Sequence, residues 1–478
     1  MKRKSFIFSM GVAALLFAAC SNDDNLMGGP AGNTPEQTIV EGVPTYATFT
    51  VKRVDRVNNT RATEAPEGET DNQIGDVTLL IFNNQTKVLE NKFTIEHPAT
   101  GVTTGTYLIT SGKKRIFAFS NLGASSGQTA IEGLQTKVST VDDMLKLTTG
   151  EVGTALGQTN TTVPMSTPND GLAKDILNGV TEADAPTHNT VAIPMSRMIA
   201  RAKLTLKSGI STHLVAKGFT ANNIAKATYI VQSAVGGVVK SPLYEKTWGA
   251  TAGTNITAAD FMAKENFYKA DGTTPETINQ LDKYYYLTEN TSPSFLKGAA
   301  THFILKAVYI PSRIITGATF NVATQNLDFV YNRTPVETDC DAYCYITESP
   351  KVDIIPAQEY FSNVAVLSAA IATYNTGIND ANKNITASDV KYTEYKKGSY
   401  YRINLGEGVD AQNTVFGVNR NTSYTVTVNS VTGPGFNTPD GNNGAEGNPV
   451  DPIDQKTYLN VTINVTPWTT ASQNVDIN

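Results

Sequence analysis

Residues 457–466, with the sequence TYLNVTINVT, alternate apolar and polar side chains along their whole length. The apolar positions are Leu459, Val461, Ile463 and Val465. A two-residue period is typical of a β-strand with one apolar face, and that face must be covered by a sheet or a groove. Such a strand can complete its own domain or be offered to a neighbouring molecule, and both alternatives stay open at this point.

Many other short segments also read as strands. The clearest are residues 46–53, 77–82, 106–110, 115–121, 302–310, 400–405 and 424–428. One short helix is predicted over 140–147, and residues 58–72 have almost no large apolar side chain, which indicates an exposed loop. Runs of strands with little helix favour antiparallel sandwiches over a parallel α/β sheet, so we expect an all-β fold.

The N-terminus has the pattern of an export signal. A basic start (MKRK) precedes an apolar run over residues 5–19 that is too short for a permanent membrane helix. The run ends in LFAAC, which resembles the lipobox of bacterial lipoproteins, and residues 21–24 (SNDD) follow, which resemble the acidic signal of surface-exposed lipoproteins. We expect a lipid on Cys20 and display on the outer membrane; the alternative is an ordinary cleaved signal peptide.

Composition excludes several functions. The net charge is only −6 and no basic patch stands out, so we expect no nucleic-acid partner. Cys340 and Cys344 are the thiols that remain once Cys20 is lipidated. They could form a small disulfide outside the cytosol, or remain two free thiols. A zinc site is not expected because no histidine lies near them in sequence.

No catalytic motif is found. The histidines at 97, 188, 213 and 302 lack metal-ligand spacing, and residues 111–114 lack the glycine spacing of a P-loop. Residues 440–446 could place oxygen ligands around calcium, but a solvated turn is the favoured interpretation. The three tyrosines at 284–286 could form a binding surface, although packing on a sheet is more usual for strand aromatics. We expect no enzyme, no cofactor and no metal.

Several pieces, taken in order, resemble one known family. They are the lipobox at Cys20, the N-terminal strand with an arginine loop at 60–62, the segment PMSRMIARAKLTL from Pro194, and the C-terminal ending. That ending is a YTVTV strand, a GPG turn at 433–435, an acidic Asn-rich loop, and YLNVTINVTPW up to Trp468. The chain resembles the fimbrillins of the Bacteroidetes, the FimA-type (type V) pilus subunits, and most closely their short-fimbria branch.

The resemblance implies two antiparallel β-sandwich domains of transthyretin-like type with a C-terminal strand appendage. The expected parts are a signal peptide (1–19), a propeptide with the lipidated cysteine and a displaced strand (20–61), an N-terminal sandwich (62–190), a C-terminal sandwich (191–422), and C-terminal strands with the donor (423–478).

The resemblance also implies polymerisation by strand exchange. The strand near residues 45–53 would complete the first sandwich with Ala47, Phe49 and Val51. A cut after Arg61 would free it and leave Ala62 as the first residue, with Arg56 as the next candidate for the cut. The vacated edges could then be filled by a strand from another subunit. The expected donor residues are Leu459, Val461, Ile463, Val465 and Trp468.

We therefore expect a structural fimbrial subunit that mediates adhesion or biofilm formation. Its expected partners are further copies of itself, other fimbrial subunits, an arginine-specific protease, and the outer membrane before cleavage. The alternatives are a tip or anchor fimbrial protein and a surface glycan-binding lipoprotein; an enzyme is the least favoured class.

Overall fold

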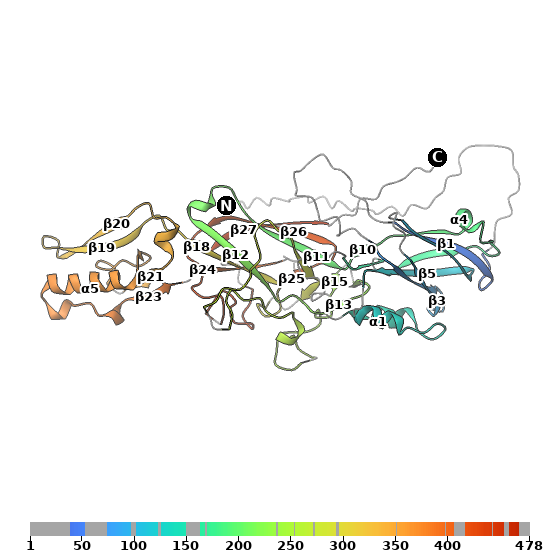
Figure 1. Ribbon diagram of the computed structural model, residues 1–478. Coiled ribbons are helices and arrows are strands. Elements are labelled where there is room, and N and C mark those ends of the chain that lie inside the picture. The colour runs from blue at the N-terminus through green and yellow to red at the C-terminus, as the bar shows by residue number, and fades with distance from the viewer. Residues whose placement is uncertain are drawn as a thin grey trace, which may run out of the picture. The chain divides into compact units, whose positions relative to one another are not determined.

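The structure is a computed structural model of the 478-residue chain. It describes residues 39–52, 74–96, 102–122, 126–149, 163–167, 170–235, 238–252, 254–270, 273–292, 296–349, 351–396, 398–405, 416–441, 443–453 and 458–467. Antiparallel sheets dominate these residues, so the predicted all-β fold is confirmed (Figure 1). Within the same ranges, no helix is long and apolar enough to cross a membrane.

The first sandwich is built from nine strands. They are β1 (Pro44–Lys52), β2 (Val77–Asn83), β3 (Leu89–Ile95), β4 (Val102–Thr110), β5 (Gly112–Ser120), β7 (Met165–Ser166), β8 (Leu172–Ile176), β9 (Thr190–Ile193) and β10 (Ser196–Arg197). One sheet has the order β4-β1-β9, and the other has the order β10-β7-β5-β2-β3 with β8 added to β5. Inward-facing side chains of both sheets form one apolar core.

A second layer covers the outer face of β2 and β5. It contains α1 (Ser126–Glu132) and α2 (Val141–Leu145). Helix α4 (Ala185–His188) is not part of this layer and contacts β1 and β9 instead. Helix α2 begins where the sequence predicts, because Thr140 and Asp143 form a capping box. Phe82 and Phe117 pack edge to face with centroids 5.7 Å apart in this layer. Strand β2 is buried on both faces as a result, which explains its unbroken apolar sequence.

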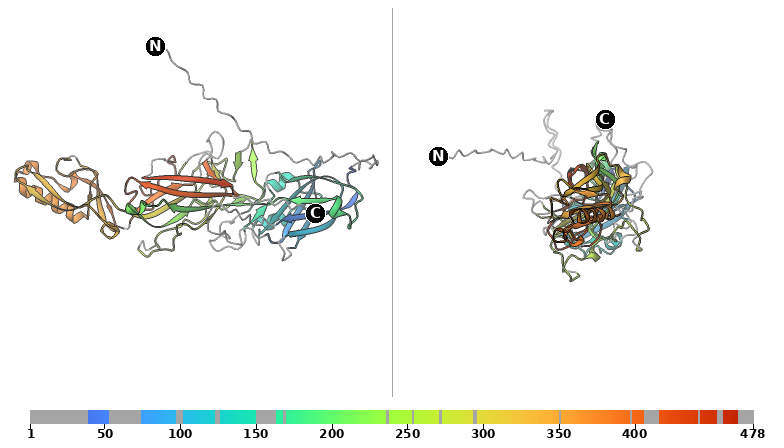
Figure 2. Two further views of the ribbon diagram at one scale, coloured as in Figure 1. Left: turned by 90° about the horizontal axis from the view of Figure 1, so that it is seen from above. Right: turned by 90° about the vertical axis from the view of Figure 1, so that its left-hand side faces the viewer.

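The second sandwich has two sheets, in the orders β16-β11-β26-β27 and β12-β18-β24. The strands are β11 (Ile199–Leu206), β12 (Leu214–Asn222), β16 (Tyr285–Thr288), β18 (His302–Tyr309), β24 (Ser399–Asn404), β26 (Thr422–Val431) and β27 (Leu459–Pro467). Their inner faces share one apolar core. Strand β27 is the last in its sheet and lies beside β26 in both figures (Figures 1 and 2).

Short elements complete this part of the chain. They are β6 (Thr148–Thr149), β13 (Thr228–Tyr229), β14 (Ser233–Val235), β15 (Val238–Lys240), β17 (Asn290–Ser292), β25 (Phe416–Val418), η2 (Ile210–Thr212) and η3 (Ala258–Asp260). Strand β13 pairs with β6, which follows the first sandwich in the chain. The buried Arg420 donates to Glu289 and to the hydroxyl of Thr228, at 3.0 and 2.8 Å, and so fixes β13 to the second sandwich.

A separate module is inserted between β18 and β24, and the sequence analysis did not predict it. Its sheet has the order β20-β19-β22-β21-β23, and α5 packs on it (Figure 1). The elements are β19 (Ile314–Asn321), β20 (Asn326–Asn332), η4 (Glu337–Cys340), β21 (Tyr343–Glu348), β22 (Tyr360–Phe361), α5 (Val364–Ile378), η5 (Ala381–Lys383), η6 (Ala387–Asp389) and β23 (Lys391–Tyr395). Helix α5 buries Leu367, Ala370 and Tyr374, and the side chain of Asn363 caps its first turn.

Candidate functional site

Strand β1 lies in the middle of its sheet. It pairs antiparallel with β4 from Pro44 to Lys52 and parallel with β9 from Thr48 to Val51. Its inward side chains are Thr45, Ala47, Phe49 and Val51, each at most 1% exposed. The alternation predicted for this strand is therefore present. Removing β1 would leave unpaired backbone groups on β4 and β9 and an open apolar groove between them.

Side chains also hold the outer face of β1. The hydroxyls of Thr48 and Thr106 lie 2.9 Å apart, and the Asn189 amide donates to the carbonyl of Tyr46 at 2.9 Å. The backbone N–H of Thr48 donates to the carbonyl of Asn189 at 3.0 Å. These bonds fix the strand's register as well as its position, since a slip would break all of them.

The residues just before β1 are docked too. The carboxylate of Glu41 accepts from the backbone N–H of Lys113 at 2.8 Å and lies 4.0 Å from the buried ammonium of Lys114. That ammonium keeps a second carboxylate, Glu90, at 2.7 Å. Departure of residues 39–52 would therefore not leave Lys114 as an uncompensated buried charge. This arrangement has no local sequence signal, because the partners are far apart along the chain.

Strand β27 occupies the edge of the second sandwich. Val426 lies opposite Ile463, and Tyr424 lies opposite Val465. Burial falls along the strand: Leu459 is 5% exposed, Val461 and Ile463 are partly buried, and Val465 is 53% exposed. This is the fold-back arrangement named as one alternative for residues 457–466. The apolar face expected from the alternation is thus only partly covered in the single chain.

The two strands are complementary in pattern. Strand β1 has four consecutive inward positions, and β27 has four alternating aliphatic side chains. Strand β1 is central and its inward side chains are fully buried, whereas β27 is an edge strand whose last aliphatic residue faces solvent. Among the described residues, no cluster of acidic, histidine or cysteine side chains could hold a metal ion.

Several predicted site residues cannot be placed. Cys20, Arg61, Ala62 and Trp468 lie outside the described residues. Their roles remain predictions from the sequence.

The disulfide between Cys340 and Cys344 does not form, so the alternative of two free thiols holds. Tyr343 and Cys344 are neighbours on β21 and face opposite sides of the sheet. Cys340 packs in the cluster of Tyr343, and Cys344 packs in that of Phe361. Burial, with acidic neighbours, raises the pKa of both thiols to about 12, which makes them unreactive at neutral pH.

The loop at residues 440–446 uses its carboxylates within the protein. Asp440 and Glu446 both pair with Lys264, at 2.5 and 3.5 Å, and Glu446 also meets the buried ring of His302 at 3.1 Å. Burial by itself raises the pKa of the Glu446 carboxyl, but the combined effect of His302, Lys264 and Arg402 is larger and in the opposite direction. The pKa is therefore lowered overall, and the carboxyl stays ionised. These contacts match a structural turn rather than a calcium loop.

The tyrosines at 284–286 are packing residues, and Tyr286 packs against the buried Val163 and Ile199. Arg201 stacks over the ring of Tyr284 at 3.9 Å. The hydroxyl of Tyr285 donates to Glu265 at 2.9 Å, and burial followed by Glu265 raises the pKa of that hydroxyl.

Two protein-family models match the chain, one toward each end. Residues 45–197 match the family model "Major fimbrial subunit protein (FimA)", and residues 393–474 match "Major fimbrial subunit protein type IV, Fimbrillin, C-terminal". The first match begins at β1 and the second ends beyond β27. No curated protein matches the chain in sequence.

Solved structures with a similar course come from Bacteroidetes species. A protein assigned to cell adhesion from Parabacteroides distasonis is 13% identical, with 90% of this chain and 100% of that chain covered and a TM-score of 0.45. One from Bacteroides eggerthii is 16% identical, with 90% and 98% covered and a TM-score of 0.42. A C-terminally truncated tip fimbrial protein from Porphyromonas gingivalis is 11% identical, with 88% and 99% covered and a TM-score of 0.37.

Proposed function

The chain belongs to the families of FimA-type major fimbrial subunits and fimbrillin C-terminal domains, and we propose that it is a structural subunit of a bacterial surface fimbria that polymerises by strand exchange. The matched families are fimbrial structural subunits, not enzymes. The observation that supports the proposal is that the chain contains both a central strand with four buried inward positions, β1, and a partly covered edge strand with four aliphatic positions, β27.

In the proposed exchange, β27 of one subunit takes the place of β1 in the next. Running in the direction of β1, it pairs antiparallel with β4 and parallel with β9, as β1 does. The four aliphatic side chains then fill four inward positions: Leu459 at Thr45, Val461 at Ala47, Ile463 at Phe49, and Val465 at Val51. Two of these positions receive a larger side chain than the one that leaves, one is unchanged, and Ile463 is smaller than the Phe49 it replaces, so the net gain in buried apolar area is modest.

Export and cleavage prepare this exchange. The precursor travels as a lipoprotein with its acyl chains on Cys20, and each buried methylene adds about 0.8 kcal/mol of membrane binding. An arginine-specific protease cuts after Arg61, in the segment between β1 and β2, so the mature subunit begins at Ala62. The cut separates β1 and the lipid anchor from the rest of the chain together. The product assembles with further copies and other fimbrial subunits into an extracellular fimbrium that serves adhesion or biofilm formation.

Two disulfide reporters that share one position test the exchange. Ile463→Cys with Val426→Cys reports the fold-back strand, because these residues lie opposite each other in the single chain. Ile463→Cys with Val191→Cys reports the exchanged strand, because Val191 lies opposite Phe49, whose place Ile463 takes. The native Cys340 and Cys344 are buried and do not interfere.

The expected result is that the first pair crosslinks within uncleaved monomers and the second crosslinks between subunits in fimbriae. Both are read as the size of the crosslinked species on non-reducing gels. Fimbriae in which only the first pair forms, within single chains, would mean that β27 never leaves its own sandwich. The strand-exchange proposal would then be wrong.

A further inference from the structure

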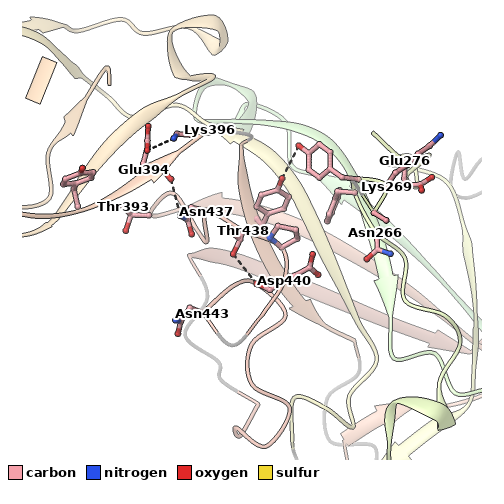
Figure 3. Close-up of a pocket in the computed structure, with 16 residues that line it drawn as sticks. Asn266, Lys269, Glu276, Thr393, Glu394, Lys396, Asn437, Thr438, Asp440 and Asn443 are labelled. Carbon is pink, nitrogen blue, oxygen red and sulfur yellow. Dashed lines mark hydrogen bonds and ion pairs between the residues drawn. The ribbon is translucent and has the colours of Figure 1, made fainter. Parts of the chain in front are cut away.

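The inserted module creates a cavity with the loops of the second sandwich. The cavity has a volume of about 1140 Å³ and is lined by residues from three segments: 266–270 with Glu276, 392–394 of β23 with Lys396 and Tyr400, and 437–440 with Asn443. Figure 3 shows residues of β23 on one side, Asn266, Lys269 and Glu276 on the facing side, and Asp440 and Asn443 below them. Pockets for small ligands usually measure roughly 300–1,000 Å³, so this one has room for several linked rings.

The walls of the cavity are fixed by hydrogen bonds. The hydroxyls of Tyr395 and Tyr401 donate to the carbonyls of Gly435 and Gly433 at 2.8 and 3.0 Å, which anchors the loop before residue 437. The Asn437 amide donates to the carbonyl of Glu394 at 3.2 Å and joins that loop to β23 (Figure 3). The cavity is therefore a preformed feature of the fold, and preformed sites bind with less ordering cost.

The lining combines aromatic rings with uncharged hydrogen-bonding groups. Phe267, Tyr268, Tyr392 and Tyr400 supply the rings, and Tyr392 is 40% exposed. Asparagine and threonine side chains supply both donors and acceptors. Within the described residues, the side chains of Thr393 and Asn443 make no hydrogen bond and are available to a ligand. A sugar needs this mixture, because each ring has an apolar C–H face and a rim of hydroxyl groups.

The charges in the cavity argue against an acidic ligand. The lining contains three carboxylates, Glu276, Glu394 and Asp440, and two ammonium groups, Lys269 and Lys396. The ammonium of Lys396 lies 2.9 Å from Glu394 and is already neutralised. The carboxylate of Asp440 is likewise paired, with Lys264, so only Glu276 and Lys269 are left and the cavity has no surplus of positive charge to attract an anionic group.

The edge of β23 argues against a peptide ligand. A peptide would add to the sheet by bonding to the free edge of this strand. The carbonyl of Glu394 on that strand is already used by the Asn437 amide. A peptide added at this edge would therefore lack one of its backbone hydrogen bonds, and the side chains of the cavity must supply most of the binding.

We propose that this cavity binds a short neutral oligosaccharide through Tyr392, Thr393 and Asn443. This proposal rests on the adhesive role proposed above and names a class of ligand for it. Sugar binding does not depend on polymerisation and is measured on the uncleaved monomer, so failure of either proposal can be told apart from failure of the other.

The test uses the full-length precursor and an array of neutral oligosaccharides with their sialylated and sulfated counterparts. We expect binding to at least one neutral oligosaccharide. In titrations with that sugar, Tyr392→Ala, Thr393→Val and Asn443→Ala should each weaken binding tenfold or more. Tyr458→Ala is the matched control, since Tyr458 is similarly exposed, at 43%, and lies outside the cavity. Thermal unfolding of each variant checks that the fold is retained.

Three outcomes would overturn the proposal. They are an array with no bound neutral sugar, binding restricted to acidic sugars, and neutral-sugar binding that the three cavity variants leave unchanged. A loss in Tyr458→Ala equal to that in Tyr392→Ala would also overturn it, because the bound sugar would then lie elsewhere.

Discussion

Val465→Asp is expected to block fimbria formation without destabilising the monomer. In the single chain Val465 is 53% exposed at the edge of its sheet, so the carboxylate of an aspartate there remains hydrated. The free energy of unfolding of the uncleaved monomer should change by less than about 0.5 kcal/mol, as for other exposed positions. Urea denaturation of the precursor measures this change.

The same substitution is costly in the proposed filament. Position 465 takes the place of Val51, which is fully buried. A buried carboxylate without a partner costs several kcal/mol, and the lost valine burial removes roughly 1.5 to 3 kcal/mol more. A total on the order of 5 kcal/mol weakens each subunit contact more than a thousandfold, because about 1.4 kcal/mol is a factor of ten.

Asn464→Asp provides the matched control, since it adds the same charge at the next residue, on the polar face of the strand. After cleavage, sedimentation and electron microscopy should find filaments from the control and none from Val465→Asp. Filaments of normal length from Val465→Asp would refute the buried position of this residue. A monomer strongly destabilised by the substitution would refute the exposed position of Val465 in the single chain.

Three further predictions concern maturation and the C-terminal loop. Cys20→Ala should abolish metabolic palmitate labelling and surface display, and a labelled variant at the surface would exclude the lipidation site. Arg61→Ala should leave an unpolymerised precursor, whereas fimbriae whose N-terminal sequence starts at residue 21 or beyond 75 would exclude a cut after Arg61. Glu446→Gln should destabilise the monomer by about 1 to 3 kcal/mol at pH 7, since it removes the charged partner of His302 and Lys264. Because the folded-state pKa of Glu446 is lowered, its stabilisation is present above the unfolded pKa of about 4.3 and is lost as the pH falls further. Urea unfolding at pH 7 and pH 3 should therefore find a smaller gap between Glu446→Gln and wild type in acid, with the exposed Glu245→Gln nearly silent at both.

The strands that were predicted from the sequence are those whose burial pattern is simple, either an alternation of buried and exposed side chains or an unbroken buried run. Strand β1 alternates because one face lies on the core, and β2 reads as a continuous apolar run because both faces are covered. The helix near residue 140 was predictable because its capping signal lies within four residues. Each of these signals is local, so a single segment contains all of it.

The inserted module could not be predicted in the same way. Helix α5 did carry a signal, with Asn363 before apolar residues spaced three or four apart at Leu367, Ala370 and Tyr374. Its sheet did not, because β22 has only two residues and pairs with strands distant in sequence. The cavity beside this module depends on three segments that meet only in the folded chain.

For the two strands of the proposed exchange, the apolar faces were predictable from the sequence, but the position of each strand in its sheet was not. Alternation identifies the apolar faces of both strands, yet it does not say that β1 is central and that β27 is an edge strand. The fall in burial from Leu459 to Val465 also depends on where β27 extends along β26. In the proposed exchange, these properties determine how firmly each strand is held in the single chain.

The proposed cut between β1 and β2 would explain how so well-buried a strand could be replaced. Before the cut, β1 is tethered to its groove, and a short tether gives an effective concentration on the order of millimolar. After the cut, β1 is a separate peptide that rebinds at its own concentration, which is about a millionfold lower if that concentration is nanomolar. Since a factor of ten is worth about 1.4 kcal/mol, such a cut weakens retention of β1 by roughly 8 kcal/mol without changing any contact. Strand β27 stays covalently attached to its own subunit, so the proposed exchange would be governed by cleavage and not by a difference in packing alone.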